Sequence, residues 1–178
     1  DRGRTAVAIS SGGWHTCAIL DNGAVSCWGR GDFGQIGNGY NFNTTTPTPT
    51  NSLGISNGIY NKAIGISSGL WHTCVALDNG ESKCWGHGGY GQLGNGATTD
   101  SYQPTITLSL GTGRTVENIS VGPAHTCALL DDGSVSCWGY GQYGQIGNGA
   151  TIDTSSPTQV SSFGNNRTAV ALSAGEQH

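Results

Sequence analysis

Residues 12–39 read GGWHTCAILDNGAVSCWGRGDFGQIGNG, and closely similar stretches occupy residues 69–96 and 122–149. Each stretch contains His-Thr-Cys in the same phase, beginning at His15, His72 and His125, and the chain ends at the equivalent His178. These positions are 57, 53 and 53 residues apart. A repeat of this length indicates tandem supersecondary units that stack on one another.

Each unit contains four segments with the composition of short β-strands. In the third unit these segments are residues 104–108, which begin at a proline, followed by 115–121, 125–130 and 134–139. An Asp-Asn-Gly or Asp-Asp-Gly sequence separates the last two, and it favours a hairpin turn because glycine and asparagine accept a positive φ. Four-stranded units repeated at about 50 residues are typical of β-propeller blades, so we expect an all-β fold.

Residues 1–178 are predicted to form one array of propeller-type blades of four antiparallel strands, with three repeats plus the start of a fourth. The expected units are 1–46, which lacks its beginning, 47–103, 104–156 and the partial unit 157–178. The second unit carries four extra residues within 55–62, where we expect a surface loop. Three blades leave a sheet face uncovered at each end, which predicts an incomplete ring or an open array.

The repeated motif resembles a known family. Gly-x-x-His-Thr, a hairpin, and then Trp-Gly-x-Gly-x-x-Gly-Gln-(Leu/Ile)-Gly is the pattern of the regulator of chromosome condensation repeat, and the resemblance covers essentially the whole chain. It implies propeller blades, which in this family form seven-bladed rings that serve mostly as interaction platforms. Members include a nucleotide exchange factor for a small GTPase, a secreted β-lactamase inhibitor and a plant ultraviolet photoreceptor. Because the functions of these members differ so widely, the resemblance implies the fold of this chain but not its function.

The six cysteines form three pairs with the same spacing. The pairs are Cys17 and Cys27, Cys74 and Cys84, and Cys127 and Cys137, each ten residues apart and centred on a hairpin turn. Directly opposed residues of an antiparallel hairpin lie within disulfide range, whereas paired Cys-x-x-Cys zinc spacing is absent from the sequence. We therefore predict three disulfides within hairpins and an extracellular or cell-surface location.

Composition excludes several functions. The chain has 7 Lys and Arg against 11 Asp and Glu, a net charge of −4, and only 10% charged residues. Scattered basic residues make no phosphate-binding face, so no nucleic acid is expected as a partner. No apolar run approaches the roughly 18 residues of a membrane span. Gly29-x-Gly31-x-x-Gly34 matches the dinucleotide fingerprint, but Gln-Ile-Gly-Asn-Gly follows it where a helix would be needed, so no cofactor is expected.

Residues that recur at the same position of each unit are more easily explained by the repeated fold than by a catalytic or metal site. The repeated histidines lie one per unit, so we expect each to be hydrogen-bonded to backbone within its own blade and to bind no metal. No Ser-His-Asp set or carboxylate pair stands out, which predicts that the protein is not an enzyme. Trp28, Trp85 and Trp138 share one position and are assigned to the core. Trp14 and Trp71 have Ala124 and Gln177 as equivalents, so the fold does not demand tryptophan there, and we predict them to be partner contacts.

Several positions could carry sugar. Sequons begin at Asn43, Asn118 and Asn166. Asn118 lies in a predicted strand and is the poorest acceptor, whereas Asn43 and Asn166 are expected in loops. The Thr/Pro tract of residues 44–50 resembles O-glycosylated tracts, and an ordinary polar loop is the alternative interpretation. Its candidate residues are Thr44, Thr45, Thr46, Thr48 and Thr50.

The sequence therefore favours a non-catalytic extracellular structural or interaction protein. One hypothesis is a building block of a surface assembly or filament, joined head-to-tail because the sequence near Arg4 returns near Arg167. The alternative is part of a closed seven-bladed propeller that binds another protein, as an inhibitor or an adhesin does. Expected partners are proteins, including further copies of this chain, and glycan.

Overall fold

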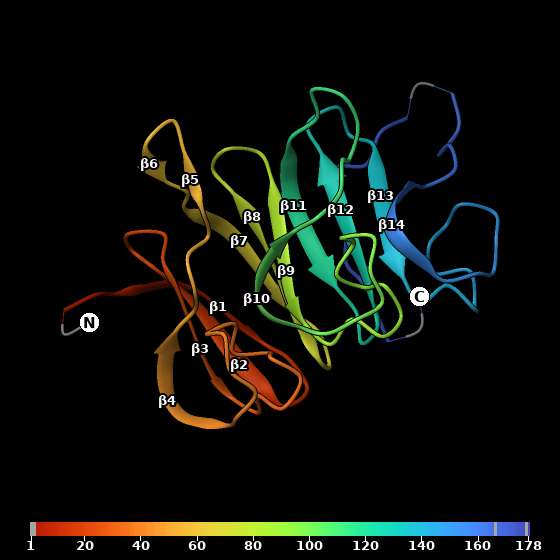
Figure 1. Ribbon diagram of the computed structural model, residues 1–178. Coiled ribbons are helices and arrows are strands. Elements are labelled where there is room, and N and C mark those ends of the chain that lie inside the picture. The colour runs from red at the N-terminus through yellow and green to blue at the C-terminus, as the bar shows by residue number, and fades with distance from the viewer. Residues whose placement is uncertain (1–2, 166, 177) are drawn as a thin grey trace.

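Three four-stranded antiparallel sheets stand side by side in the computed structural model, which describes residues 3–165, 167–176 and 178 (Figure 1). Blade 1 consists of β1 (Ala6–Ser11), β2 (His15–Leu20), β3 (Val25–Gly29) and β4 (Thr44–Pro49). Blade 2 consists of β7 (Ala63–Ser68), β8 (His72–Leu77), β9 (Ser82–Gly86) and β10 (Ser101–Ile106). Blade 3 consists of β11 (Val116–Val121), β12 (His125–Leu130), β13 (Val135–Gly139) and β14 (Thr154–Gln159). The expected all-β fold is confirmed.

The tight turn between the second and third strands of each blade is made by the predicted glycine. In blade 1 the Gly23 amide donates to the Leu20 carbonyl (2.8 Å), and the Leu20 amide donates to the Ala24 carbonyl (2.8 Å). Gly23, Gly80 and Gly133 have φ values of 81°, 85° and 74°, which side chains disfavour. The same turn therefore sets the same register three times.

The proline-containing strands belong to the end of a blade rather than to its beginning. β10, which contains Pro104, pairs with β9 of blade 2 through Thr105 and Cys84. The expected boundaries at 46/47, 103/104 and 156/157 thus fall inside β4, β10 and β14. The physical reason is that these strands lie at the outer edge of each sheet, where a residue without an N–H is tolerated.

The four-residue insertion forms a small hairpin instead of the expected loop. β5 (Ile55–Ser56) pairs with β6 (Ile59–Tyr60), and the hairpin protrudes beside blade 2 (Figure 1). Asn57 and Gly58 connect the strands with φ values of 52° and 77°. Asn-Gly is the preferred connection for a two-residue hairpin, because both of its residues accept a positive φ.

Neighbouring blades share hydrophobic cores. The core between blades 1 and 2 contains Cys17, Ile19 and Ile36 from blade 1 and Val75 and Trp85 from blade 2. The indole of Trp85 donates to the Gln35 carbonyl (2.8 Å), and Trp138 of blade 3 donates in the same way to the Gln92 carbonyl of blade 2 (2.9 Å). Each tryptophan therefore packs backwards, onto the preceding blade.

The C-terminal segment starts to repeat this packing. The Ala169 amide donates to the Gly133 carbonyl (2.9 Å), as the Val116 amide does to Gly80 (2.9 Å). Ala169 and Leu172 lie against the core of blade 3. The described residues of 167–178 form no strand, yet they dock as the first strand of a fourth blade would.

Candidate interaction surface

The three cysteine pairs are disulfide-bonded in the structure as the spacing predicts. Cys17 faces Cys27, Cys74 faces Cys84 and Cys127 faces Cys137 in the strand register, with Cα atoms 4.1 Å apart in every pair. The first two disulfides are fully buried, and Cys127–Cys137 lies against the core of blade 3. Three structural disulfides fit an oxidising environment.

Replacing both Cys74 and Cys84 by alanine should lower the free energy of unfolding by about 3 kcal/mol, because the unfolded chain regains the freedom of the loop that the disulfide closes. Urea denaturation of the oxidised variant and of the unmodified protein measures the difference. Non-reducing peptide mapping is the control that the two remaining pairs stay intact. An unchanged denaturation midpoint would show that this disulfide does not contribute.

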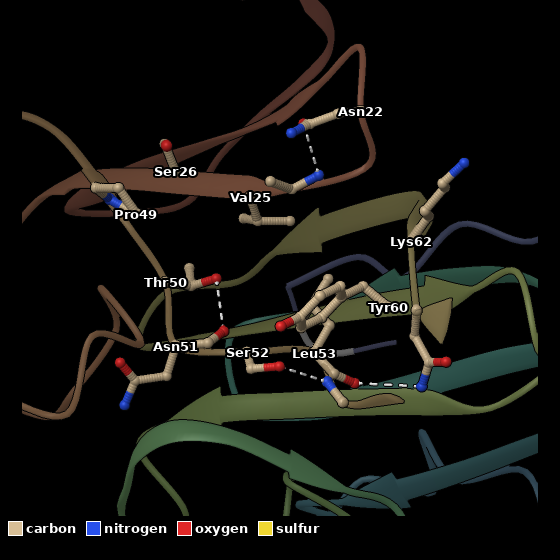
Figure 2. Close-up of a pocket in the computed structure, with 13 residues that line it drawn as sticks. Asn22, Val25, Ser26, Pro49, Thr50, Asn51, Ser52, Leu53, Tyr60 and Lys62 are labelled. Carbon is tan, nitrogen blue, oxygen red and sulfur yellow. Dashed lines mark hydrogen bonds between the residues drawn. The ribbon is translucent and has the colours of Figure 1, made fainter. Parts of the chain in front are cut away.

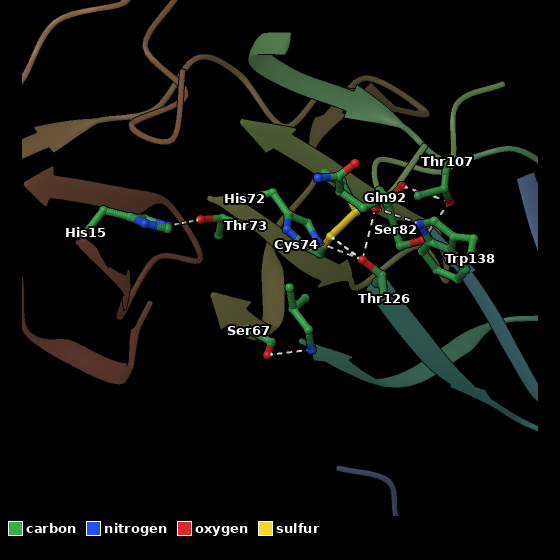
Figure 3. The surroundings of a disulfide bond; sticks show 12 residues. His15, Ser67, His72, Thr73, Cys74, Ser82, Gln92, Thr107, Thr126 and Trp138 are labelled. Carbon is green, nitrogen blue, oxygen red and sulfur yellow. Dashed lines mark hydrogen bonds between the residues drawn. A yellow bond between two sulfur atoms is a disulfide. The ribbon is translucent and has the colours of Figure 1, made fainter. Parts of the chain in front are cut away.

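The repeated histidines do not bond to backbone within their own blade, contrary to the sequence-based expectation. His15 Nε2 lies 2.6 Å from Thr73 Oγ1, and His72 Nε2 lies 2.9 Å from Thr126 Oγ1, in each case in the next blade (Figure 3). The imidazole ring reaches across the interface and meets a threonine one strand position before a cysteine. It therefore joins two blades.

The surrounding hydrogen bonds define the tautomer of His72. The Thr126 hydroxyl donates its proton to the Gln92 carbonyl (2.9 Å), so it accepts the hydrogen bond from His72. His72 is therefore protonated on Nε2. The Trp138 indole donates to the same Gln92 carbonyl (2.9 Å), so one backbone oxygen anchors two groups of blade 3 (Figure 3).

Burial keeps these histidines neutral. Desolvation lowers the pKa of His15 to about 4. Desolvation is the main reason that the pKa of His72 is lowered to about 3, with a smaller lowering from the neighbouring His15 and His125 side chains. The pKa of His125 is also lowered by burial. Among the described residues no group of three or more His, Cys, Asp or Glu side chains is placed to hold a metal ion.

A continuous row of aromatic side chains lies along one edge of the three blades. It is built from three equivalent positions per blade: the residue before the histidine, the residue after Cys-Trp-Gly, and the second x in Gly-x-x-Gly. We call these side chains the aromatic row. Its members are Trp14 and Phe33 in blade 1, Trp71, His87 and Tyr90 in blade 2, and Tyr140 and Tyr143 in blade 3, while Arg30 and Ala124 occupy the two remaining positions.

Backbone hydrogen bonds fix the first two positions of each blade at this edge. His15 pairs with Gly29 in the sheet, so the residue before β2 and the residue after β3 are neighbours. The Arg30 amide donates to the Trp14 carbonyl (2.8 Å). The same bond joins His87 to Trp71 (2.9 Å) and Tyr140 to Ala124 (2.8 Å).

A glutamine holds the third position. The Phe33 amide donates to Gln35 Oε1 (2.9 Å), and the equivalent bonds join Tyr90 to Gln92 and Tyr143 to Gln145, both at 2.9 Å. Gln35 and Gln92 are fully buried. The loop that presents the aromatic ring is therefore anchored in the interior of the protein.

The rings contact one another from blade to blade. Trp14 stacks on Trp71 with centroids 6.2 Å apart, and Phe33 meets Trp71 edge-on at 5.4 Å. The row continues through His87, Tyr90, Tyr140 and Tyr143 with centroid separations between 5.2 and 6.0 Å. Edge-to-face and stacked contacts of this kind hold rings in defined orientations.

The row is accessible to solvent. Trp14 is 57% exposed, Tyr90 44% and Tyr143 67%, and the remaining members are half-buried. Large exposed aromatic side chains that contact one another mark an interaction site more often than isolated ones do. The protein therefore carries a preformed aromatic surface that its core does not require.

Arg30 adds a cation that is already paired. Its guanidinium carbon lies 4.7 Å from the centroid of Trp71 and 6.0 Å from that of Trp14. The guanidinium also donates to both carboxylate oxygens of Asp32 at 2.6–2.9 Å, and this hydrogen bonding holds the pKa of Asp32 below its usual range. The local charge is thus nearly neutral.

The structure brings the two predicted contact residues, Trp14 and Trp71, together on this surface. Sequence reasoning missed Phe33, Tyr90 and Tyr143, although the signal was present. An aromatic residue stands at the second x of Gly-x-x-Gly in every unit. An exposed position that is aromatic three times is not explained by packing of the fold.

The predicted sugar sites are placed differently from the expectation in one respect. The Thr/Pro tract is not a loop, because residues 44–49 form the edge strand β4, with Thr45 and Thr46 exposed and Thr44 and Thr48 half-buried. Asn43 lies just before β4, and its side chain accepts a hydrogen bond from the Gly31 amide (3.0 Å). Asn166 lies outside the described residues. Glycosylation at Asn43, Asn166 or the threonines remains a prediction.

A separate pocket of about 400 Å³ lies at the opposite edge of blades 1 and 2, near the hairpin turns. Its lining includes Asn22, Val25, Leu53 and Tyr60, and the one charged side chain, Lys62, extends away from the others (Figure 2). In the described part of the chain, no helix is long and apolar enough to cross a membrane.

The sheets and their edges define an array of β-propeller blades. Sequence profiles described as the regulator of chromosome condensation (RCC1) repeat match residues 22–76, 84–129 and 132–178, and, for a second profile of that description, residues 6–35, 63–92 and 116–145. The chain belongs to the regulator of chromosome condensation repeat family.

Two curated relatives show the range of the family. The chain is 32% identical over 177 residues to the ultraviolet-B receptor UVR8 of Arabidopsis thaliana, covering 98% of this chain and 38% of the receptor. It is 33% identical over 155 residues to the E3 ubiquitin-protein ligase HERC2 of Homo sapiens, covering 86% of this chain and 3% of the ligase. The chain therefore spans well under half of these relatives.

Solved structures show the same fold. Yeast RCC1 (Prp20) bound to Kap60 matches with a TM-score of 0.79 and 20% identity, covering 97% of this chain and 40% of that chain. Human WBSCR16 matches with a TM-score of 0.57 and 21% identity, covering 99% of this chain and 57% of that chain. At this level of identity the match concerns the fold alone.

Proposed function

We propose that the protein is a non-catalytic extracellular building block whose blades dock head-to-tail onto further blades of the same kind. One observation carries this proposal. The two outer faces of the array carry the same complementary side chains that meet at the interfaces between neighbouring blades. The three disulfides support the extracellular setting.

The face of blade 1 that points away from blade 2 carries the first half. Trp28 and Thr16 occupy the positions of Trp85 and Thr73, which are fully buried against the preceding blade. Trp28 and Thr16 are only half-buried. A preceding blade would receive the Trp28 indole and offer a histidine to the Thr16 hydroxyl.

The outer face of blade 3 carries the second half. A pocket of about 370 Å³ is lined there by His125, Gln145 and Gly147. In blades 1 and 2 the equivalent histidine, glutamine carbonyl and glycine contact the threonine and tryptophan of the next blade. A Cβ on Gly37 would lie 2.7 Å from the Trp85 indole, so glycine makes the space that the tryptophan occupies. The pocket of blade 3 is the equivalent socket, and Ala169 and Leu172 of the C-terminal segment line its other side, so an incoming blade would take the place of this segment.

Such a contact is heterologous and can be repeated indefinitely. It gives a ring if the rotation closes and a filament if it does not. The second candidate is a closed propeller that acts as a protein-binding platform, with the sockets filled by further blades of its own chain. Yeast RCC1 (Prp20), which has the same fold, supports this class of function, since it is bound to Kap60 in one structure and has binding properties to Gsp1p and histones.

Sedimentation velocity and electron microscopy of the purified protein test the assembly. We expect particles larger than one chain, and we expect Trp28→Asp to disperse them, because a carboxylate cannot enter the apolar socket. The matched control is Tyr60→Asp, which places the same charge on a tyrosine that is 70% exposed in the β5–β6 hairpin and should leave the particles intact.

Monodisperse particles of one chain would overturn head-to-tail assembly and leave the platform as the explanation. Particles that persist in Trp28→Asp and disperse in Tyr60→Asp would place the contact at the β5–β6 hairpin instead.

A further inference from the structure

We propose that the aromatic row is a binding site for a neutral carbohydrate chain. The proposal does not depend on how the blades assemble, because the row is already continuous across the three blades of one chain. It rests on the chemistry of the exposed side chains, on their order across three blades and on the charge around them.

The row is not a by-product of the fold. Ala124 occupies the position of Trp14 and Trp71 in blade 3 and makes the same backbone hydrogen bond through its carbonyl. The loop glycines and the glutamine bonds form in all three blades irrespective of which ring they present. The aromatic side chains therefore add a surface to a scaffold that would form without them.

A sugar ring has the features that this surface complements. It presents a flat face of C–H groups, which stack on aromatic rings, and a rim of hydroxyl groups, which need hydrogen-bond partners. Trp14 and Tyr90 supply exposed ring surface, and the phenol groups of Tyr140 and Tyr143 supply donors and acceptors beside it. Tyrosine and tryptophan combine an apolar body with a polar edge in this way.

The order of the rings favours a chain over a single sugar. Centroid separations from Trp14 to Tyr143 stay between 5.2 and 6.2 Å, so the aromatic surface is unbroken across three blades. Successive units of a linear oligosaccharide could each meet a ring. Backbone and glutamine bonds hold the rings before binding, which reduces the ordering cost.

The local charge favours a neutral ligand. Arg30 is neutralised by Asp32, and two further carboxylates, Asp100 and Asp153, sit behind the loops that carry Tyr90 and Tyr143. The net charge of the chain is −4. Sulfated or uronic polysaccharides would be repelled by these carboxylates, whereas neutral hexose or pentose chains would not.

A proline-rich peptide fits the surface less well. Such peptides dock in aromatic-lined grooves, and the pockets described above are lined by other residues, at the turn edge and on the outer face of blade 3. The most exposed members of the row, Trp14 and Tyr143, are 57% and 67% exposed to solvent.

The test is calorimetry and tryptophan fluorescence of the purified protein titrated with cellohexaose, xylohexaose, mannohexaose and chitohexaose. We expect at least one of these neutral probes to bind and to shift the fluorescence, with the hexamer binding more tightly than its dimer. Trp14→Ala and Tyr143→Ala should each weaken binding by about tenfold, the loss expected for one stacking contact.

The matched control is Tyr60→Ala, which removes a tyrosine that is 70% exposed but lies in the β5–β6 hairpin away from the row. Thermal melts should show that the row variants remain folded. The proposal is overturned if no hexasaccharide binds, if Tyr60→Ala and the row variants weaken binding equally, if heparin binds more tightly than every neutral probe, or if a decaproline peptide alone binds the row.

Discussion

Replacing Trp85 by alanine should lower the free energy of unfolding by about 3–5 kcal/mol, the range for loss of a fully buried large aromatic side chain. The equivalent change Trp28→Ala should lower it by much less. Trp85 is 0% exposed within the core between blades 1 and 2, and its indole donates to the Gln35 carbonyl. Trp28 is half-buried at the open face of blade 1.

Comparing Trp85→Ala with Trp28→Ala separates the energy of the contact between blades from the contribution that the tryptophan makes within its own blade. Both tryptophans follow a disulfide cysteine on the third strand of a blade, so their local backbone is the same. Trp138→Ala provides a second case and should resemble Trp85→Ala, since Trp138 is also fully buried and donates to the Gln92 carbonyl.

Urea denaturation of dilute protein, followed by circular dichroism, measures the three variants. The concentration should be low enough that any head-to-tail contact of Trp28 is dissociated, because a partner blade would bury this residue too. Equal destabilisation by Trp28→Ala and Trp85→Ala under these conditions would show that contacts within the blade, and not contacts between blades, dominate.

The sequence predicted the fold because the repeat fixes so many positions at once. The strands 125–130 and 115–121 were placed to within a residue, since the His-Thr-Cys and Asp-Asp-Gly landmarks bound them. The cysteine spacing around Asn22 gave the disulfide register, because a tight turn forces residues at equal distances into opposition. Short-range geometry of this kind can be read without a structure.

The grouping of strands into blades could not be read in the same way. β10 could close blade 2 or open blade 3, and both arrangements preserve the period of the repeat. The choice depends on pairing across the loop of residues 87–100, which is a long-range contact. Pro104 was the available signal, because proline favours an edge strand.

The residues of the candidate site also fall into those that the sequence predicts and those that it does not. Trp14 and Trp71 stood out because one repeat lacks tryptophan there. The contact of Phe33 with Trp71 was hidden, since it joins two blades through residues 38 positions apart and depends on how the blades stack. The threonine partner of each histidine was hidden for the same reason.

Acidification from pH 7 to pH 4.5 should destabilise the protein by roughly 4–5 kcal/mol through His15 and His72 together, about 2 kcal/mol from each. The pKa of each is near 6.5 when unfolded and about 4 and about 3 when folded, because burial disfavours the charged ring. Between these values the unfolded chain binds more protons than the folded protein. Stability is therefore complete above pH 6.5 and is lost as the pH falls toward the folded values.

The loss of stability in acid that comes from the histidines can be separated from the loss that comes from the carboxylates. The pKa values of Asp32 and Asp132 are lowered below 3.8, and both side chains are exposed, so their effect falls below the measured window. His72→Gln keeps a donor for the Thr126 hydroxyl but removes the titrating ring. Stability profiles from urea denaturation at half-unit pH steps should then be less steep between pH 6 and 4.5, and His15 and His125, whose pKa values are also lowered by burial, account for the slope that remains. An unchanged slope of stability against pH in His72→Gln would contradict the prediction, and so would a flat profile in the unmodified protein. Either result would mean that protonation of the histidines between the blades is not what destabilises the protein in acid.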